Sequence, residues 1–539
     1  MILTAVVFTF IMTTFLSTVA FAIDLSKDKT IYTVSNAHLD TQWNWDVRTT
    51  INSYIPKTLN NNFALFEKYP DYQFNFEGAF RYALAKEYYP AEYERMKGYI
   101  DKGKWNVTGS SWDAGDVNVP SPEALMRNIL YGNGYFKDEF GKSSVDIFLP
   151  DCFGFGYALP SVANHMGLKG FSTQKLTWGS AYGIPFDIGR WYGVDGSYLI
   201  SALNPESYTT SYGSSLSAQG SKWVNRVNNN GGYGVYAAYT YHGTGDTGGS
   251  PSDGSVKVVQ DDINKGLDPE TNVKVLSAPA DQIFRDITPE QAEGLPLWDD
   301  ELVMSTHAVG GYTSRAISKR WNRQNELLAD ATERASVMAD WLGGAPYPKE
   351  QLDEAWKRFV WHQFHDDIPG TSVPSAYVIS WNDYILSLNQ FASELTNGVG
   401  AISNAMNTSA DGIPVVVYNP ISKPRKDVVE AKVDFAEAPK AIKVYDDKGD
   451  EVPSQLVATN GNTAEILFLA DMPSVGYKVY DVRSAEESCD METGLSITDS
   501  TLENNYYKVT IDSNGDIASI IDKVNGKELL SAPSRLELL

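Results

Sequence analysis

The stretch VDIFLPDCFGFG, Val145 to Gly156, sets the fold class that we expect for this chain. Its first half, VDIFLP, is a short apolar run that is typical of a buried strand, and the run ends at the carboxyl group of Asp151. Open α/β sheets and β/α barrels place ligands and catalytic groups at the carboxyl ends of their strands. Asp151 is therefore a candidate nucleophile or metal ligand, and its alternative role is to cap the helix that follows.

Strand-like and helix-like segments alternate over residues 28–290. The apolar runs IYTVSNAH and YGVYAAYTYH alternate with helical stretches such as PAEYERMKGYIDKG and SPEALMRNILYGNGYFKDEF. In the last of these stretches, Ser121 is a suitable N-cap and Pro122 suits the first helical turn. The pattern predicts an α/β domain with a mostly parallel sheet.

Three further regions follow, each with its own pattern. Residues 291–400 hold long stretches with few Gly or Pro and with apolar residues at helical spacing, which predicts a helical bundle. Residues 411–486 contain short β-rich runs bounded by turn residues, which predicts a β-sandwich. Residues 497–539 contain two or three more strands with NG turns, and we expect them to be the start of a truncated C-terminal β domain.

Length, charge and cysteine content restrict the class of protein. A chain of 539 residues is too long for one hydrophobic core and indicates several domains. Its 44 Lys and Arg against 68 Asp and Glu give a net charge of -24, which repels phosphate backbones, so we expect no nucleic-acid partner. The two cysteines, Cys152 and Cys489, fall in different predicted domains, and we expect no structural disulfide.

The N-terminal residues 1–22, MILTAVVFTFIMTTFLSTVAFA, form an apolar run that ends in a small-x-small cleavage pattern, Ala20-Phe21-Ala22. We expect them to be a secretory signal peptide. The alternative is an uncleaved membrane anchor, because about 20 apolar residues can also span a bilayer. Both readings place the rest of the chain outside the cytoplasm, secreted or periplasmic, with no stable membrane contact if the signal is removed.

Three polar segments supply further groups for a site at the strand ends. In AHLDTQWNW, His38 and Asp40 are two residues apart on an extended strand, so their side chains face the same way. In WHQFHDDIPGTS, His365 and Asp366 precede Ile-Pro-Gly, where a helix must end. In HGTGDTGGSPSDG, a glycine-rich loop carries Asp246. Each segment also has an ordinary structural explanation: a polar strand end, a solvated helix end or a surface turn.

Together with the carboxylate after VDIFLP, these segments supply two His and two Asp for one metal ion, and a further carboxylate on a loop. Zn²⁺ accepts imidazole nitrogen and carboxylate oxygen, and its open coordination positions can bind adjacent hydroxyl groups of a sugar. Mg²⁺ and Ca²⁺ favour an all-oxygen set. The glycine-rich loop is not a phosphate cradle, because it lacks a GKS or GKT ending and has no basic residue nearby.

These motifs, in this order, resemble glycoside hydrolase family 38, the retaining α-mannosidases. AHLDTQW is similar to the family's opening metal motif, FLPDCFGFGYALP with GLKGFSTQKLTW to its nucleophile segment, and QFHDDIPGT to its later His-Asp motif. ELVMSTHAVGGYTSR, Glu301 to Arg315, is similar to the run that precedes the helical domain. The resemblance covers residues 30–375 well and implies a seven-stranded β/α barrel, a three-helix bundle and β-sandwich domains, the last of them truncated here.

The resemblance also implies a role for each site residue and one Zn²⁺ per chain. The zinc ligands would be His38, Asp40, Asp151 and His365. Asp151 would also be the nucleophile that attacks an α-mannoside, while the metal holds sugar hydroxyls O2 and O3. Trp43 and Phe153 would line the sugar subsite, and Asp366 would hydrogen-bond sugar hydroxyls. Asp246 would be the general acid/base, since a retaining glycosidase needs one ionised and one protonated carboxyl group.

The chain departs from the family pattern at Cys152, where many relatives carry a hydroxyl residue, and at Phe364, where many carry a second His. Two other functions compete with hydrolysis of an α-mannoside glycan or oligosaccharide. A zinc-dependent deacetylase or amidohydrolase also uses H-x-D at a strand end, but it needs a base beside the metal and no acid on a remote loop. A catalytically inactive carbohydrate-binding relative would have lost a metal ligand or Asp151, and all of these are present.

Overall fold

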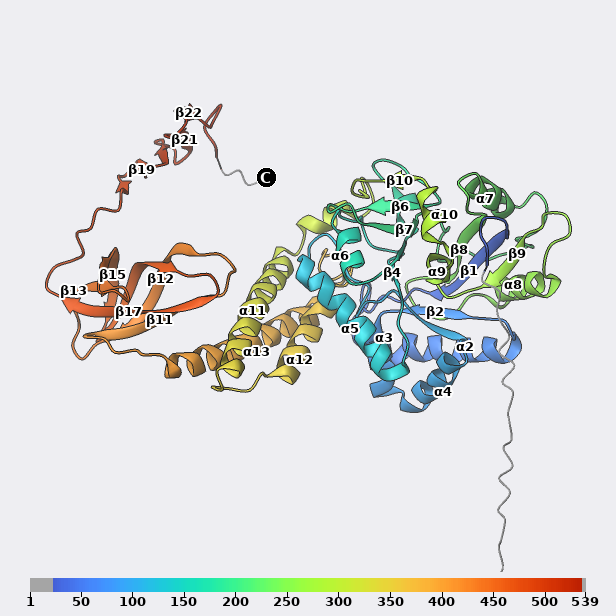
Figure 1. Ribbon diagram of the computed structural model, residues 1–539, viewed down its shortest axis with the longest axis horizontal. Helices are drawn as coiled ribbons and strands as arrows, with labels where there is room; N and C mark the ends of the chain where they lie inside the picture. The colour runs from blue at the N-terminus through green and yellow to red at the C-terminus, as the bar shows by residue number, and fades with distance from the viewer. Residues whose placement is uncertain (1–22, 536–539) are drawn as a thin grey trace, which may run out of the picture. The chain divides into compact units, whose positions relative to one another are not determined.

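The computed structural model describes residues 23–535, which form two compact units (Figure 1). The first unit comprises residues 23–329 and 349–391, and the second comprises residues 330–348 and 392–535. The predicted signal peptide, residues 1–22, lies outside the described part of the chain. Within the described part, no helix is both long enough and apolar enough to cross a membrane.

A parallel sheet in the first unit carries the first half of the predicted site. Its strands are β1 (Thr30–Ala37), β2 (Phe74–Glu77), β3 (Trp105–Thr108), β8 (Ala237–Thr244) and β9 (Lys274–Ser277). They lie in the order β3-β2-β1-β8, with β9 beside the first half of β1, and every pairing is parallel. All of β1 is buried, as is typical of a parallel strand covered on both faces. The mostly parallel sheet predicted from the sequence is therefore present.

A second sheet in the same unit carries Asp151. Its strands are β4 (Asp146–Phe148), β5 (Gly170–Ser172), β6 (Ile188–Tyr192), β7 (Tyr198–Ala202) and β10 (Leu297–Trp298). They lie in the order β10-β6-β7-β5-β4, and only the pair β6 and β7 is antiparallel. In the described residues the two sheets are not joined by a strand pairing, so the seven-stranded barrel remains a prediction.

The two sheets share one hydrophobic core. A single buried cluster contains Val34 of β1, Phe148 of β4, Ile200 of β7 and Tyr241 of β8. The rings of Phe148 and Tyr241, one from each sheet, have their centres 5.1 Å apart. Because core side chains are close-packed, this cluster fixes the strand ends of one sheet against those of the other.

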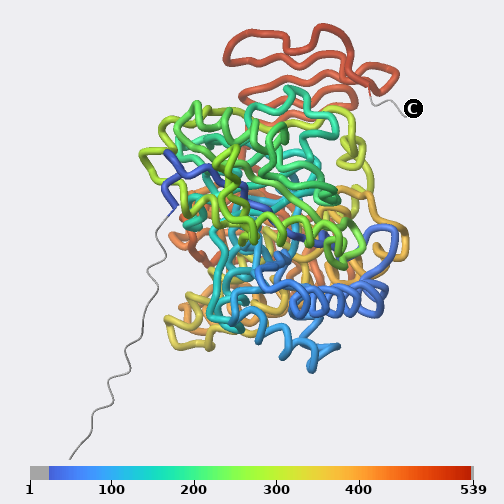
Figure 2. Tube along the Cα trace, turned by 90° about the vertical axis from the view of Figure 1, so that its right-hand side faces the viewer, coloured from blue at the N-terminus to red at the C-terminus, as the bar shows by residue number. Residues whose placement is uncertain are grey.

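Helices link the strands of both sheets, and α2 to α4 lie on one side of β1 and β2 in both views (Figures 1 and 2). Their bounds are α2 (Ile55–Lys68), α3 (Ala79–Tyr88), α4 (Pro90–Asp101), α5 (Pro122–Phe140), α6 (Leu159–His165), α7 (Lys222–Gly231), α8 (Asp253–Lys265), α9 (Gln282–Asp286) and α10 (Pro289–Glu293). The predicted start of α5 is confirmed, because Ser121 accepts a hydrogen bond from the backbone N–H of Ala124 and Pro122 is in the first turn.

The second unit is mainly antiparallel β structure. One sheet contains β11 (Ile413–Asn419), β13 (Ala441–Tyr445), β14 (Glu451–Val452) and β17 (Gly476–Ala485), and the other contains β12 (Arg425–Asp434), β15 (Ser454–Asn460) and β16 (Thr463–Met472). Buried residues of both sheets, such as Val444 and Phe468, form one core. A separate sheet follows, of β18 (Ser496–Ile497), β19 (Thr501–Glu503), β20 (Tyr507–Ile511), β21 (Ile517–Asp522) and β22 (Lys527–Glu528).

Three long helices occupy the region predicted to be helical. They are α11 (Ala316–Trp341), α12 (Lys349–Val360) and α13 (Pro374–Ala405). In the first unit, Asn325 of α11 donates a side-chain hydrogen bond to the backbone carbonyl of Tyr384 in α13, and the rings of Trp356 in α12 and Phe391 in α13 lie 6.0 Å apart. The helices therefore pack on one another around the loop that joins α12 to α13.

That loop is fixed by His362, a fully buried side chain that the sequence did not distinguish from His365. Its Nδ1 lies 2.8 Å from Asp367 Oδ2, and its Nε2 lies 3.0 Å from Asp383 Oδ2 on α13. Burial alone would lower the pKa of His362, but the hydrogen bonds to the two carboxylates outweigh burial and raise it. A doubly protonated imidazole can donate to both carboxylates and so links the loop to α13.

We expect His362→Ala to lower the free energy of unfolding by about 3 kcal/mol at pH 6, because it leaves Asp367 and Asp383 without their cation. Since the folded-state pKa of His362 is raised, this stabilisation is complete below its ordinary pKa and is lost as pH rises through the raised value. Denaturant unfolding of wild type and variant at several pH values measures the difference.

The matched control is His165→Ala, at the exposed C-terminal end of α6, which should change stability by less than about 0.5 kcal/mol. Equal stability of His362→Ala and wild type at pH 6 would contradict the role given to this imidazole.

Candidate active site

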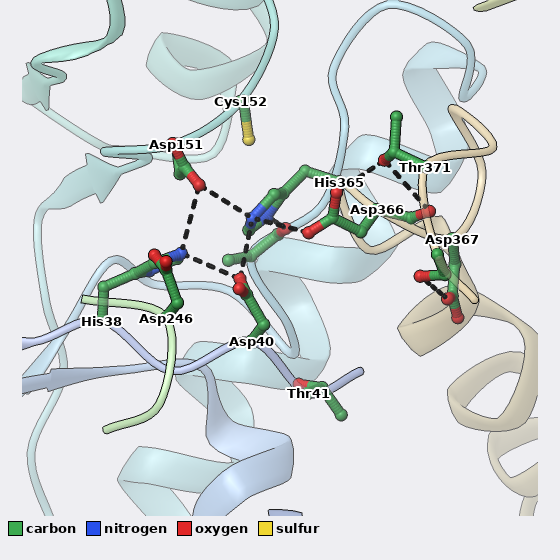
Figure 3. Close-up of polar contacts among 12 residues, drawn as sticks. His38, Asp40, Thr41, Asp151, Cys152, Asp246, His365, Asp366, Asp367 and Thr371 are labelled. Carbon is green, nitrogen blue, oxygen red and sulfur yellow. Dashed lines mark hydrogen bonds and ion pairs between the residues drawn. The ribbon is translucent and has the colours of Figure 1, made fainter. Parts of the chain in front are cut away.

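The four predicted metal ligands meet at the strand ends of the two sheets (Figure 3). His38 and Asp40 follow β1, Asp151 follows β4, and His365 comes from the loop between α12 and α13. One ligand atom from each side chain lies within 4.8 Å of the corresponding atom of every other. Residues more than 300 positions apart in the sequence therefore converge on one point.

The donor atoms at this point fit a metal ion. His38 Nε2 and His365 Nε2 lie 3.0 and 3.2 Å from Asp40 Oδ1, and 3.8 and 4.0 Å from Asp151 Oδ2. Both of these imidazole nitrogens and both carboxylate oxygens of Asp40 are buried, yet none has a hydrogen bond of good geometry within the described residues. Unpaired buried polar atoms are costly, and two imidazole nitrogens with two carboxylates are a donor set that suits Zn²⁺.

The second nitrogen of each imidazole is held by the protein. His38 Nδ1 lies 2.6 Å from Oε1 of Glu77, the buried last residue of β2. His365 Nδ1 lies 2.8 Å from the backbone carbonyl oxygen of Ala114. Both partners are acceptors, so in each neutral ring Nδ1 carries the proton and Nε2 keeps its lone pair for the metal.

A buried ion pair fixes the backbone beneath these ligands. Arg81 Nη2 lies 3.1 Å from Asp113 Oδ1, and both side chains are fully buried. Arg81 Nε also donates to the carbonyl of Leu39, between two of the ligands, and Thr41 donates to the second oxygen of Asp113. The backbone N–H of Ala114 donates to Asp113, so one ion pair holds both the β1 loop and the carbonyl that orients His365.

The groups around the two imidazoles raise their pKa values. Burial alone would lower the pKa of His38, but Glu77 and Asp40 outweigh burial and raise it to about 10. The pKa of His365 is also raised well above its ordinary value, since nearby Cys152 and Asp40 outweigh burial. Although burial opposes ionisation of Asp40, the two imidazoles hold its pKa below the ordinary value.

Asp151 has a different partner for each oxygen. Its Oδ2 faces the two imidazoles, and its Oδ1 accepts a hydrogen bond from Lys175 Nζ. Lys175 is the first residue of η2 (Lys175–Trp178), a short helix after β5. The alternative role of Asp151 as a helix cap is wrong, because the next helix, α6, begins at Leu159 with Ala158 as its N-cap.

The loop that carries Asp246 is paired with the metal-binding segment. Asp40 N–H donates to the carbonyl of Asp246 at 2.8 Å, and Gly248 N–H donates to the carbonyl of His38 at 3.1 Å. The hydroxyl of Tyr208 donates a hydrogen bond to Asp246 Oδ1 at 2.9 Å. Burial raises the pKa of Asp246, and the negative charge of Asp40 raises it further. The carboxyl group of Asp246 lies beside His38 (Figure 3). The loop is therefore not the free surface turn weighed above.

Two of the predicted sugar-contacting residues, Asp366 and Phe153, lie beside His365. Asp366 is 3% exposed and accepts a hydrogen bond from Thr371 at 2.5 Å, so it does not belong to a solvated helix end. Burial and the neighbouring Asp40 raise the pKa of Asp366 to about 8. The Phe153 ring is edge-on to His365, with 6.2 Å between centres. The backbone carbonyl of Trp43 accepts a hydrogen bond from the backbone N–H of Val373 at 2.7 Å.

The two departures from the family pattern lie behind the ligands. Cys152 is fully buried, its thiol donates to the carbonyl of Gly115 at 3.3 Å, and burial raises the thiol pKa to about 11. The Phe364 ring lies 4.1 Å from the His365 ring and contacts the guanidinium of Arg81. Both cysteines, Cys152 and Cys489, are free, as the sequence predicted.

Three functional side chains were not singled out from the sequence: Glu77, Lys175 and Tyr208. Lys175 lies inside the segment GLKGFSTQKLTW that carries the family resemblance, but nothing in that segment indicates that this lysine pairs with Asp151. Glu77 is the last residue of the strand FNFE, and His38 directly follows a strand. A polar residue at a strand end could therefore have marked Glu77 as a candidate site residue. Nothing in the sequence near Tyr208 distinguishes it from the other tyrosines.

Comparison with protein families follows the same division of the chain. Residues 28–301 match the N-terminal domain of glycosyl hydrolases family 38, and residues 306–402 match the α-mannosidase middle domain. The chain belongs to glycoside hydrolase family 38. All residues of the candidate site lie within these two matched regions of the family 38 chain.

Several relatives are called α-mannosidases. The chain is 26% identical over 530 residues to α-mannosidase G of Dictyostelium discoideum and 25% identical over 510 residues to human α-mannosidase 2C1, covering 94% and 93% of this chain but 47% and 45% of those proteins. It thus spans about half the length of the curated relatives it matches. A solved α-mannosidase from Enterococcus faecalis V583 shares the fold, with mixed α/β and β-sheet domains, at a TM-score of 0.73, 19% identity and coverage of 93% and 61%.

We expect Glu77→Gln to weaken zinc affinity by about tenfold or more, because it removes the charge that orients and polarises His38. A competition titration against a chromophoric chelator measures the affinity. Glu87→Gln on the exposed face of α3 is the control and should leave the affinity unchanged. Equal affinity of Glu77→Gln and wild type would contradict the role of this carboxylate.

We also expect metal binding to release protons, because the pKa values of His38 and His365 are raised in the metal-free protein. A pKa of about 10 favours a protonated His38 ring at neutral pH, and the pKa of His365 shifts in the same direction, so affinity should rise with pH by about tenfold per pH unit for each proton displaced. Calorimetry in buffers of different ionisation enthalpy counts the protons. His365→Ala should release about one proton fewer, and an affinity independent of pH between 6 and 9 would refute this account.

Proposed function

We propose that this chain is a metal-dependent α-mannosidase that hydrolyses terminal α-linked mannose with retention of configuration. The observation that supports it best is the convergence of His38, Asp40 and His365, which carry unpaired buried donor atoms, with the Asp151 carboxylate in a chain that belongs to family 38. Several relatives of this chain are named α-mannosidases, and its partner would be an α-mannoside glycan or oligosaccharide. The apolar N-terminal sequence supports a secreted or periplasmic location.

One Zn²⁺ would be held by His38, Asp40, Asp151 and His365. When bound, the ion supplies Lewis acidity and holds hydroxyls O2 and O3 of the mannose ring. Asp151 is the nucleophile, and its attack on the anomeric carbon forms a covalent mannosyl ester while the bond to the leaving oxygen breaks. Lys175 offsets part of the negative charge of this carboxylate and holds Oδ1 in place.

Asp246 is the acid/base partner. Burial and nearby Asp40 raise its pKa, which favours the protonated form needed to protonate the leaving oxygen. In the second step the same carboxylate takes a proton from water, whose oxygen attacks the anomeric carbon and releases Asp151. Tyr208 donates to Asp246 Oδ1 and leaves the other oxygen free to carry the transferred proton.

The remaining residues position the sugar. Phe153 and Trp43 supply aromatic surface on which the C–H groups of a sugar ring can pack. Asp366, buried and fixed by Thr371, can hydrogen-bond sugar hydroxyls. Trp43 and Asp366 come from the two ligand-bearing segments, which are joined by a backbone hydrogen bond between Trp43 and residue 373, so the sugar site and the metal site share one frame.

Two alternative functions have less support. A deacetylase or amidohydrolase would use metal-bound water and a base next to the metal, and would not need a carboxyl group with a raised pKa on the β8 loop. An inactive carbohydrate-binding relative would lack one of the ligands or Asp151, and these are all present and converge.

We expect the purified protein to release the aryl group from an aryl α-mannoside only when metal is present. Metal is first stripped with a chelator, then restored as Zn²⁺ or Co²⁺, and aryl β-mannoside and aryl acetate are the control substrates. Rate restored by metal on the α-mannoside alone would support the proposal. Hydrolysis of the acetate, or equal rates with and without metal, would refute it.

We further expect Asp151→Asn to reduce turnover by about 10⁴-fold or more with little change in melting temperature, because the amide keeps the shape of the carboxylate but cannot attack. Asp195→Asn is the control: it makes the same chemical change at an exposed loop residue of the same unit, and it should retain activity. Residual turnover by Asp151→Asn within about tenfold of wild type would exclude Asp151 as the nucleophile.

A further inference from the structure

The proposed reaction leaves one exposed aromatic side chain beside the nucleophile without a role. Trp178 is 44% exposed and ends η2, the short helix whose first residue, Lys175, pairs with Asp151. Lys175 Nζ lies 5.0 Å from the centre of the Phe153 ring and 4.5 Å from the centre of the Trp178 ring. Trp178 is therefore separated from the Asp151 carboxylate by a single ammonium group, and it continues the aromatic surface that Phe153 begins.

The indole is held in one orientation. Trp178 Nε1 donates to Gln174 Oε1 at 3.0 Å, and the amide of Gln174 donates to the carbonyl of Pro150 at 3.0 Å, next to the nucleophile. Gln174 is fully buried, so this link is shielded from solvent. A ring that is fixed before binding loses little conformational entropy when a ligand stacks on it.

A second side chain reaches the same place from a distant segment. Leu302 and Phe155 exchange backbone hydrogen bonds at 2.9 and 3.0 Å, and Ser305 N–H donates to the carbonyl of Gly179 at 2.8 Å. The segment is thus paired with the loop that follows the nucleophile and with the loop that follows η2. His307 lies two residues after Ser305, so this pairing positions its imidazole.

His307 completes an aromatic wall with two open hydrogen-bonding atoms. Its ring is edge-on to Trp178 with 4.8 Å between centres, and edge-on to Phe153 with 5.8 Å between centres. The ring is half-buried, and no residue in the described part of the chain hydrogen-bonds to either of its nitrogens. The next residue, Ala308, has a φ of +58°, a left-handed conformation that costs free energy for alanine and persists where the surroundings enforce it.

We propose that Trp178 and His307 form a second sugar subsite, which binds the ring adjacent to the mannose held at Asp151. The indole face packs against the C–H groups of that ring, and the imidazole hydrogen-bonds one of its hydroxyls. The inference rests on the proposed α-mannosidase function and adds the residues that recognise the second ring: because of Trp178 and His307, α-linked manno-oligosaccharides bind better than simple mannosides.

The kinetic test compares two substrates of the zinc-loaded protein, α-linked mannotriose and α-mannosyl fluoride, whose leaving group has no second ring. Trp178→Ala should lower kcat/KM for mannotriose by about tenfold, mainly through KM, and change the value for the fluoride by less than about twofold. His307→Ala should act in the same direction, with partial recovery in His307→Gln, which keeps a donor. Tyr233→Ala is the control: Tyr233 is 51% exposed and precedes β8, at the end of the strand away from the site.

If Trp178→Ala lowers kcat/KM equally for both substrates, Trp178 contacts the first ring. If its KM for mannotriose is unchanged, Trp178 does not contact the substrate. Either result overturns the inference. If wild type hydrolyses neither substrate, the proposed function fails, and binding then decides the subsite separately. Calorimetry on zinc-loaded Asp246→Asn, with and without Trp178→Ala, should show about tenfold weaker mannotriose binding and unchanged mannose binding in the double variant. Equal mannotriose affinity in the two proteins would overturn the inference.

Discussion

The ion pair between Arg81 and Asp113 is the interaction on which the geometry of the candidate metal site depends. Both side chains are inaccessible to solvent, and a charge in that position must be paired. The guanidinium holds the carbonyl of Leu39, and the carboxylate holds Thr41 and the backbone N–H of Ala114. The loop that carries His38 and Asp40 and the carbonyl that orients His365 are thereby held by one ion pair, whose two residues are not among the predicted ligands.

The four residues that converge in the candidate site were named from the sequence because most of them have a local signal. His38 and Asp40 are two residues apart at the end of a strand, and Asp151 ends an apolar run, so their positions follow from strand periodicity and from where sheets place functional groups. The alternation of strands and helices in the first unit, the start of α5 and the β-rich segments of the second unit had similarly local signals. These features depend on neighbours in the chain and were predicted correctly.

Features that depend on tertiary packing were not predictable in this way. His362 and His365 are three residues apart in one motif, and only packing against α13 directs the first to Asp383 and leaves the second for the ligand set. Glu77, at the end of β2, and Lys175, at the start of η2, contact residues that are distant in the sequence, and no sequence spacing encodes those contacts. The grouping of strands into two hydrogen-bonded sheets was also not evident, because apolar runs in either sheet have the same pattern.

The backbone at Asp246 restricts which side chains this position accepts. Its φ of +65° lies in the left-handed region, which Asp, Asn and Gly enter far more readily than longer or branched residues do. Glutamate, the other natural carboxylic acid, would carry a backbone cost in addition to its longer reach. The residues that the backbone tolerates best after aspartate are asparagine and glycine, and neither can donate an acidic proton. At this position, therefore, the backbone favours aspartate over glutamate as the acid of the proposed reaction.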